Sequence, residues 1–188
     1  MTPHQFAAKW KVADLSERSA YQQHFLDLCA LLNEKTSADV DPTGQSFTFE
    51  KGVDKSAGGK GFADVWRRGC FGWEYKGKHK DLTKAYAQLL NYREALENPP
   101  LLIVCDLNKF VVRTNFTGPP TEKHEFDLDG LADPKHLDLL RRAFADPYSL
   151  KPGRTQKQVT EDVAKKFAAV ADGMQARAID PHAAGYCP

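Results

Sequence analysis

The sequence predicts an α/β fold in which a mixed central β-sheet is flanked by helices. Two observations predict it. Segments of helical periodicity alternate with short strand-like segments, and one of these strand-like segments is continuously apolar, as in a strand buried on both faces. The chain has 188 residues, of which 41% are hydrophobic, enough for one buried core. No apolar run approaches the roughly 18 residues of a membrane span, so we expect no membrane partner.

The first half of the chain contains one helix and three strands. Apolar side chains recur at helical spacing over residues 14–32. Residues 46–53 (SFTFEKGV) alternate between apolar and polar, which is typical of a strand. Residues 62–66 and 71–76 are two further strands around the turn RRGC, so we expect them to pair as a β-hairpin.

A helix and two strands follow. Residues 82–96 have strong helical periodicity, and Asp81 stands where an N-cap is expected. Residues 101–107 (LLIVCDL) form the continuous apolar strand, and residues 110–116 (FVVRTNF) form the next strand after a short turn.

The remaining residues predict two helices and a boundary between them. The helices span about 134–144 and 155–177, and the segment 146–154 (DPYSLKPGR) separates them. We therefore expect a main domain over residues 1–150, followed by a C-terminal helix and tail over residues 151–188.

Cysteine usage and the N-terminal segment indicate a compartment. The four cysteines are scattered, without a CxxC pair, which disfavours structural zinc and a disulfide framework. The first residues lack the basic-then-apolar order of a secretory signal. We therefore expect a cytoplasmic protein.

The charge of the chain is unevenly distributed. The whole chain carries 26 Lys and Arg against 25 Asp and Glu, but residues 51–93 alone carry ten against four. Such a block suits a surface that faces phosphates, although charge alone favours a solvated face without a partner.

Three polar residues in the predicted hairpin form the main candidate site. Glu74 and Lys76 are two apart on a strand and therefore share a face, and Asp64 on the preceding strand can lie across from them. Two carboxylates suit Mg²⁺, and a lysine can orient a water and offset charge on phosphorus, which is the chemistry of phosphodiester hydrolysis.

The string (Asp/Glu)-x-Lys has little specificity by itself. It occurs twice, in Glu74-Tyr-Lys76 and in Asp133-Pro-Lys135. The second begins a predicted helix, since proline favours the first helical turn. The first lies on a predicted strand, follows a partner aspartate and belongs to the basic block, so its context favours it.

The helix that follows adds two more residues to this pattern. Gln88 and Tyr92 are four apart and share a helix face. The run Asp64-x9-Glu74-x-Lys76, followed by Gln88-Leu-Leu-Asn-Tyr92, resembles the PD-(D/E)XK nuclease superfamily in its RecB-like branch.

A narrower resemblance covers about residues 10–175. The segments SERSAYQQHFLDLCALL, GGKGFADVWRRGCFGWEYKGKHKDLTKAYAQLLNYREALENPPLLIVCDL and FVVRTNF resemble the N-terminal endonuclease domain of MmeI-like type II restriction–modification enzymes. One departure is Ala63, where the superfamily usually has proline before the first aspartate.

The resemblance implies a PD-(D/E)XK restriction-endonuclease-like core and a metal-dependent deoxyribonuclease. It makes Asp64 and Glu74 ligands of Mg²⁺, for which Mn²⁺ can substitute, and Lys76 the catalytic lysine. Gln88 and Tyr92 would organise the site and its DNA strand.

The expected substrate is double-stranded DNA. Five basic residues are expected to contact its phosphates, which gives affinity without sequence information. They are Arg67, Arg68, Lys78, Lys80 and Lys84.

The resemblance also implies further domains. In MmeI-like enzymes a helical connector, a DNA methyltransferase and a target-recognition domain follow the nuclease. This sequence contains no glycine-rich S-adenosylmethionine loop, so we expect no methyltransferase activity from this chain alone.

Two other readings of the sequence stay open. One is a non-catalytic DNA-binding or regulatory remnant of a truncated methyltransferase–restriction protein, and the other is a small repair-type nuclease. Pairing of two copies as a dimer, to break both DNA strands, is also open.

Overall fold

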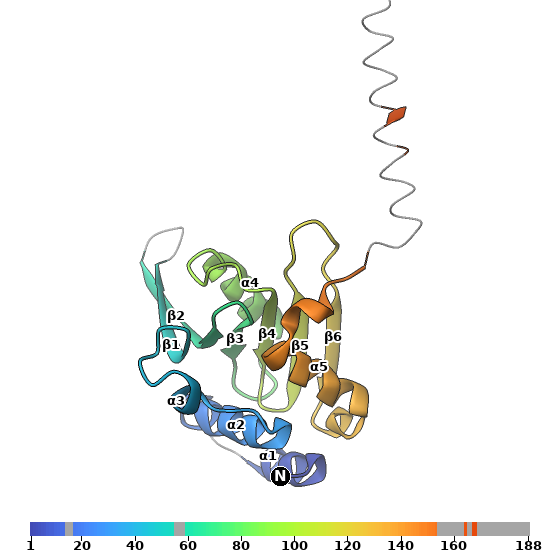
Figure 1. Cartoon of the computed structure of the whole chain (residues 1–188). Helices are drawn as coiled ribbons and strands as arrows, with labels where there is room; N and C mark the ends of the chain where they lie inside the picture. Colours follow the sequence, from blue (N-terminus) through green and yellow to red (C-terminus); the bar gives the residue numbers. More distant parts are fainter. Residues whose placement is uncertain (14–16, 55–58, 154–163, 165–166, 169–188) are drawn as a thin grey trace, which may run out of the picture. The chain divides into compact units, whose positions relative to one another are not determined.

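The computed structural model describes residues 1–13, 17–54, 59–153, 164 and 167–168. A six-stranded sheet with the spatial order β1-β2-β3-β4-β5-β6 lies among helices (Figure 1). The fold is therefore α/β with a mixed central sheet, as the sequence predicts. No helix in these ranges is long and apolar enough to cross a membrane.

The bounds of the elements are as follows. The helices are α1 (Pro3–Val12), α2 (Glu17–Leu32), α3 (Ser37–Val40), α4 (Leu82–Tyr92) and α5 (Pro134–Ala145), with 3₁₀ turns η1 (Asp129–Ala132) and η2 (Pro147–Leu150). The strands are β1 (Phe47–Asp54), β2 (Lys60–Arg67), β3 (Phe71–Tyr75), β4 (Leu101–Cys105), β5 (Lys109–Thr114) and β6 (Lys123–Asp127).

The sheet contains a single parallel pair, β3 with β4, and the other four pairs are antiparallel. Parallel strands need a crossover connection, and α4 supplies it. The predicted hairpin of residues 62–66 and 71–76 is confirmed as β2 and β3, in the register Val65↔Trp73. The predicted N-cap Asp81 is also confirmed, because its side chain accepts from the amide of Thr83.

Three of these helices and strands, α1, α3 and β6, are absent from the sequence prediction. Helix α1 is short, and its only large buried side chains are Phe6 and Trp10, which are four apart and pack in the core. Strand β6 (KHEFD) buries only Phe126 because it is the edge of the sheet, so it shows no apolar alternation. Helix α4 ends at Tyr92, four residues before the predicted end at Leu96.

The chain divides into two compact units, Met1–Pro152 and Gly153–Pro188. The elements above belong to the first unit. The predicted helix over 155–177 lies almost wholly outside the described residues.

The sheet has a core on each face. The larger core lies between the sheet and helices α1, α2 and α5, and it contains Trp73, Ile103 and Phe110. The smaller core lies on the opposite face under α4 and contains Leu102 and Val104. Successive residues of β4 thus alternate between the cores, which is why this strand is apolar throughout.

The end of α4 is held tightly against the sheet. A Cβ at Gly72 would lie 2.9 Å from Leu96 Cδ1, so a larger residue would require the Leu96 side chain to shift. The Trp66 indole on β2 donates a hydrogen bond to the Leu96 carbonyl at 2.8 Å. These contacts set the position of α4 above β3.

The larger core contains a histidine among aromatic rings. His24 is fully buried, packs against Phe6, Trp10 and Phe110, and its Nδ1 lies 3.0 Å from the Tyr75 hydroxyl. Burial lowers the pKa of His24 to about 3, because the charged ring would lose its hydration.

We expect acid to destabilise the protein through His24. Between pH 6.5 and about 3 the unfolded chain binds a proton that the native His24 does not, so stability is lost as pH falls below 6.5. The slope is about 1.4 kcal/mol per pH unit. Urea unfolding at pH 7.5, 6 and 5 measures it. His24→Phe should remove this slope, whereas His124→Gln, at a partly exposed site on β6, should keep it.

Candidate active site

Strands β2 and β3 separate at the candidate site. Their pairing runs from Arg67↔Phe71 to Val65↔Trp73 and stops there. Beyond that point the Asp64 side chain replaces the missing backbone partner, because its Oδ2 accepts a hydrogen bond from the Tyr75 amide at 2.6 Å. The Asp64 carboxylate is thus bound to the backbone between Glu74 and Lys76.

The Glu74 side chain connects strand β3 with helix α4. Its Oε1 accepts from the Lys76 ammonium at 2.7 Å and from the Gln88 amide at 2.6 Å. Glu74 is only 3% exposed. A buried carboxylate requires an opposite charge and hydrogen-bond donors, and these two neighbours supply both.

Residues 74–76 are paired with the parallel neighbour β4. Glu74 is in register with Val104 and Tyr75 with Cys105. The Lys76 amide continues the ladder by donating to the Cys105 carbonyl at 2.8 Å. Tyr75 points the other way, into the large core, so Glu74 is left on the face of α4.

A tyrosine and a second glutamate lie near Asp64. Tyr21 on α2 donates a hydrogen bond from its hydroxyl to Glu50 Oε1 at 3.1 Å. Burial raises the pKa of Tyr21 to about 12, and the negative charges of Glu50 and Asp64 act in the same direction. Glu50 has a left-handed φ of 51°, which an L-residue adopts only at a cost. The sequence shows neither this conformation nor the pairing with Tyr21.

The other predicted site residues are distributed over several surfaces. Tyr92 is buried in the small core beneath α4, one turn after Gln88. The Lys78 ammonium donates to backbone carbonyls at the C-terminal end of α1, those of Lys11 at 3.0 Å and Ala13. Lys80 and Lys84 are exposed, before and within the first turn of α4.

The two arginines lie at the turn of the β2–β3 hairpin, at the end away from Asp64. Arg67 packs over the Phe47 ring, with 5.1 Å from its guanidinium carbon to the ring centroid. Arg68 forms an ion pair with Glu97 at 2.9 Å. The structure does not bring them together with Glu74.

Comparison with known proteins places the chain in a family. The family model described as "MmeI, N-terminal domain" matches residues 1–177. The chain belongs to the MmeI N-terminal domain family. This confirms the narrower resemblance seen in the sequence.

Other comparisons add less. A search of curated proteins gave no match. Among solved structures, a chain of the "cryoEM structure DrdV-DNA complex" matches with a TM-score of 0.45 and 18% identity. The match covers 80% of this chain and 14% of that chain, so this chain spans a small part of the length of that protein.

The donor set of this MmeI N-terminal domain fits a magnesium ion. Asp64 and Glu74 offer carboxylate oxygens, the ligands that Mg²⁺ prefers. No group of three His, Cys, Asp or Glu in the described ranges is placed to hold a metal. Mg²⁺ typically binds one or two carboxylates and keeps several waters, so two carboxylates are sufficient.

We expect the Lys76–Glu74 pair to stabilise the domain at neutral pH. Lys76→Met removes the ammonium from a buried carboxylate and should lower the free energy of unfolding by about 1–3 kcal/mol. Adding Glu74→Gln should recover most of this loss, because the remaining side chain is neutral. Urea unfolding of both single variants and the double variant measures the coupling. Additive effects of the two substitutions would contradict the expectation.

Proposed function

We propose that this domain is a Mg²⁺-dependent DNA endonuclease of an MmeI-like restriction–modification system, and that it hydrolyses DNA phosphodiester bonds. One observation carries the proposal. The Asp64 carboxylate is hydrogen-bonded to the amide of Tyr75, the residue between Glu74 and Lys76. Two carboxylates and an ammonium are therefore attached to one short backbone segment.

In this proposal Asp64 and Glu74 hold the metal. When bound, Mg²⁺ polarises a non-bridging phosphate oxygen and lowers the pKa of a water. Gln88 holds the Glu74 side chain in place through the hydrogen bond of 2.6 Å. Tyr92 supports Gln88 indirectly, since it anchors the next turn of α4 in the small core.

Lys76 is the residue that acts on the reacting atoms. Its ammonium orients the attacking water and offsets the negative charge that builds on the phosphoryl oxygens. The water oxygen attacks phosphorus in line, the bond from phosphorus to the leaving oxygen breaks, and that oxygen receives a proton. The Lys76 side chain is 24% exposed, so a substrate phosphate can reach it.

Family membership supports the restriction setting. In such a system DNA methylation and target recognition belong to other domains, and we propose that this domain supplies the cut. Its own contacts to DNA are then with phosphates, and the recognition sequence is read elsewhere.

The test is nicking of supercoiled plasmid DNA by the purified chain with Mg²⁺, Mn²⁺ or EDTA. Lys76→Ala should lower the rate by at least about 100-fold. It should leave Mn²⁺ binding, followed by calorimetry, within about threefold. Asp64→Asn should abolish both, because it removes a ligand.

The matched control is Lys135→Ala, an exposed lysine on α5, which should behave as wild type. Equal nicking by wild type and Lys76→Ala would overturn the catalytic proposal. Binding of DNA without metal binding or nicking would instead identify a non-catalytic DNA-binding module.

A further inference from the structure

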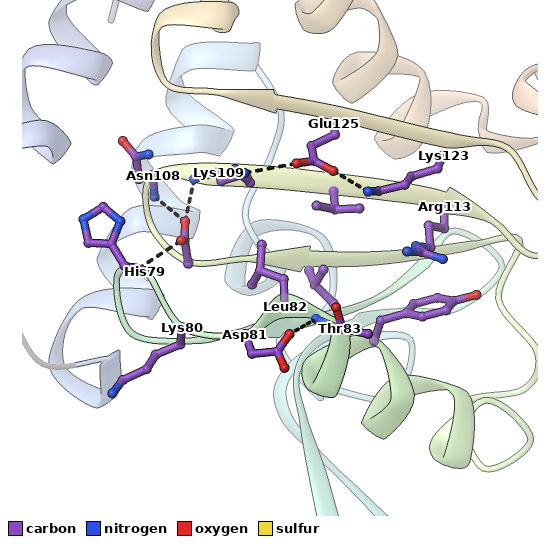
Figure 2. Close-up of a pocket in the computed structure, with 14 residues that line it drawn as sticks. His79, Lys80, Asp81, Leu82, Thr83, Asn108, Lys109, Arg113, Lys123 and Glu125 are labelled. Atoms are coloured by element: carbon purple, nitrogen blue, oxygen red, sulfur yellow. Dashed lines mark hydrogen bonds and ion pairs between the residues drawn. The ribbon is translucent and has the colours of Figure 1, made fainter.

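Among the described elements, one helix, α4, covers only part of its face of the sheet. A helix is about 10 Å wide and neighbouring strands lie about 4.8 Å apart, so a single helix covers about two strands. Helix α4 lies over β3 and β4, and the small core between them contains Leu89 and Val104. Strands β5 and β6 continue beyond it, and a cleft of about 480 Å³ opens between them and the start of α4 (Figure 2).

The strand side of the cleft is basic because of the sheet register. Val111 packs in the small core, so Lys109 and Arg113, two residues either side of it on β5, share the face of α4. On β6, Lys123 is in register with Arg113, and Glu125 with Val111. Two cations thus stand directly opposite each other on neighbouring strands, an arrangement that is unfavourable unless an anion lies between them.

Arg113 is held on an aromatic ring of α4. Its guanidinium carbon lies 4.1 Å from the centroid of Tyr86. Its Nε is buried and has no hydrogen-bond partner in the described part of the chain. None of the ion pairs between described residues includes Arg113. The guanidinium therefore rests on an aromatic ring, and no ion pair among the described residues neutralises its charge.

The carboxylates of the cleft are engaged in other contacts. Asp106 accepts from the backbone amides of His79, Asn108 and Lys109. Asp81 accepts from the amide of Thr83 and caps α4. These two carboxylates are thus occupied by backbone amides.

The third carboxylate, Glu125, is shared by two lysines. It accepts from Lys109 at 3.0 Å and also pairs with Lys123 (Figure 2). Hydrogen bonds from Lys123 and then Lys109 lower the pKa of Glu125, so it stays ionised at neutral pH. One negative charge thus serves two positive ones, and the strand side keeps a surplus of positive charge.

We propose that this cleft binds a phosphate group of a nucleic-acid strand, with Arg113 and Lys123 as its ligands. Guanidinium groups recognise phosphate oxygens through paired hydrogen bonds, and Lys123 adds a second positive charge. Lys80, in the loop before α4, also lines the cleft. The choice of a nucleic acid rests on the proposed function.

The cleft lies on the opposite flank of α4 from the candidate active site. Gln88 points to Glu74, whereas Tyr86, two positions earlier on the helix, lines the cleft. The two sites therefore lie on different flanks of the same helix. The cleft would thus fix the register of the DNA on the domain.

The test measures DNA binding without cleavage. Fluorescence anisotropy with a labelled 24-bp duplex in EDTA gives Kd for wild type, Arg113→Gln, Lys123→Gln and the double variant. Each single substitution should raise Kd by about three- to tenfold, and the double variant should reduce the slope of log Kd against log salt by about two. Thermal unfolding checks that the variants fold.

A variant that is expected to strengthen DNA binding separates the effect of charge from the effect of unfolding. Glu125→Gln removes the carboxylate that neutralises Lys109 and Lys123, so it should lower Kd by about two- to fivefold, which loss of structure cannot do. Lys135→Gln, a charge change of the same size on α5, should leave Kd within about twofold. The mononucleotide dAMP should bind more than tenfold more weakly than the duplex.

The proposal is overturned if the Arg113 and Lys123 variants bind the duplex like wild type, or if wild type does not bind it. Suppose that dAMP binds tightly, that these variants lose this binding, and that their duplex binding is unchanged. The ligand of the cleft would then be a free nucleotide and not a nucleic-acid strand. Nicking separates this proposal from the proposed function. If the variants show the expected binding pattern but wild type does not nick DNA, the phosphate-binding cleft is supported and the proposed nuclease activity is contradicted. If wild type nicks DNA but the binding pattern is absent, only the proposal for the cleft is contradicted.

Discussion

The separation of β2 from β3 is the constraint on which the candidate site depends. Tyr75 is fully buried, so its amide cannot reach water and requires an acceptor inside the protein. Strand β2 no longer offers a carbonyl at this point, and the Asp64 carboxylate takes its place at 2.6 Å. The same hydrogen bond that satisfies the backbone brings a carboxylate to the segment that carries Glu74 and Lys76. The hydrogen bond between Asp64 and the Tyr75 amide therefore serves both the stability of this segment and the proposed chemistry.

Both sites border helix α4, which among the described elements is the one helix on its face of the sheet. The close approach at Gly72 and the hydrogen bond from Trp66 hold its end on β2 and β3. One flank then presents Gln88 to the buried Glu74. The other flank leaves β5 and β6 uncovered, and the cleft follows from that gap. The opposite face, covered by α1, α2 and α5, carries the large core.

Most of the secondary structure could be predicted from local patterns. The β2–β3 hairpin, the apolar strand β4 and the start of α4 each leave a pattern in consecutive residues. The elements that were missed, α1, α3 and β6, have little such pattern, because α1 and β6 bury only a few side chains and the four-residue α3 buries none. The spacing of Asp64, Glu74 and Lys76 was readable in the same way, since alternation along strands defines a shared face.

The sequence by itself determined the fold class, the order of most elements and the family, all of which depend on the spacing of neighbouring residue types. Only the tertiary structure decided which of the basic residues meet. Arg113 faces Lys123 because of the register of β5 with β6, whereas Arg67 and Arg68 lie at the turn of the hairpin away from Asp64. It also decided that Glu50 takes a left-handed backbone and bonds to Tyr21. These arrangements depend on contacts between residues far apart in the chain, and a local pattern contains no record of strand register or of which side chain a helix presents to its neighbour.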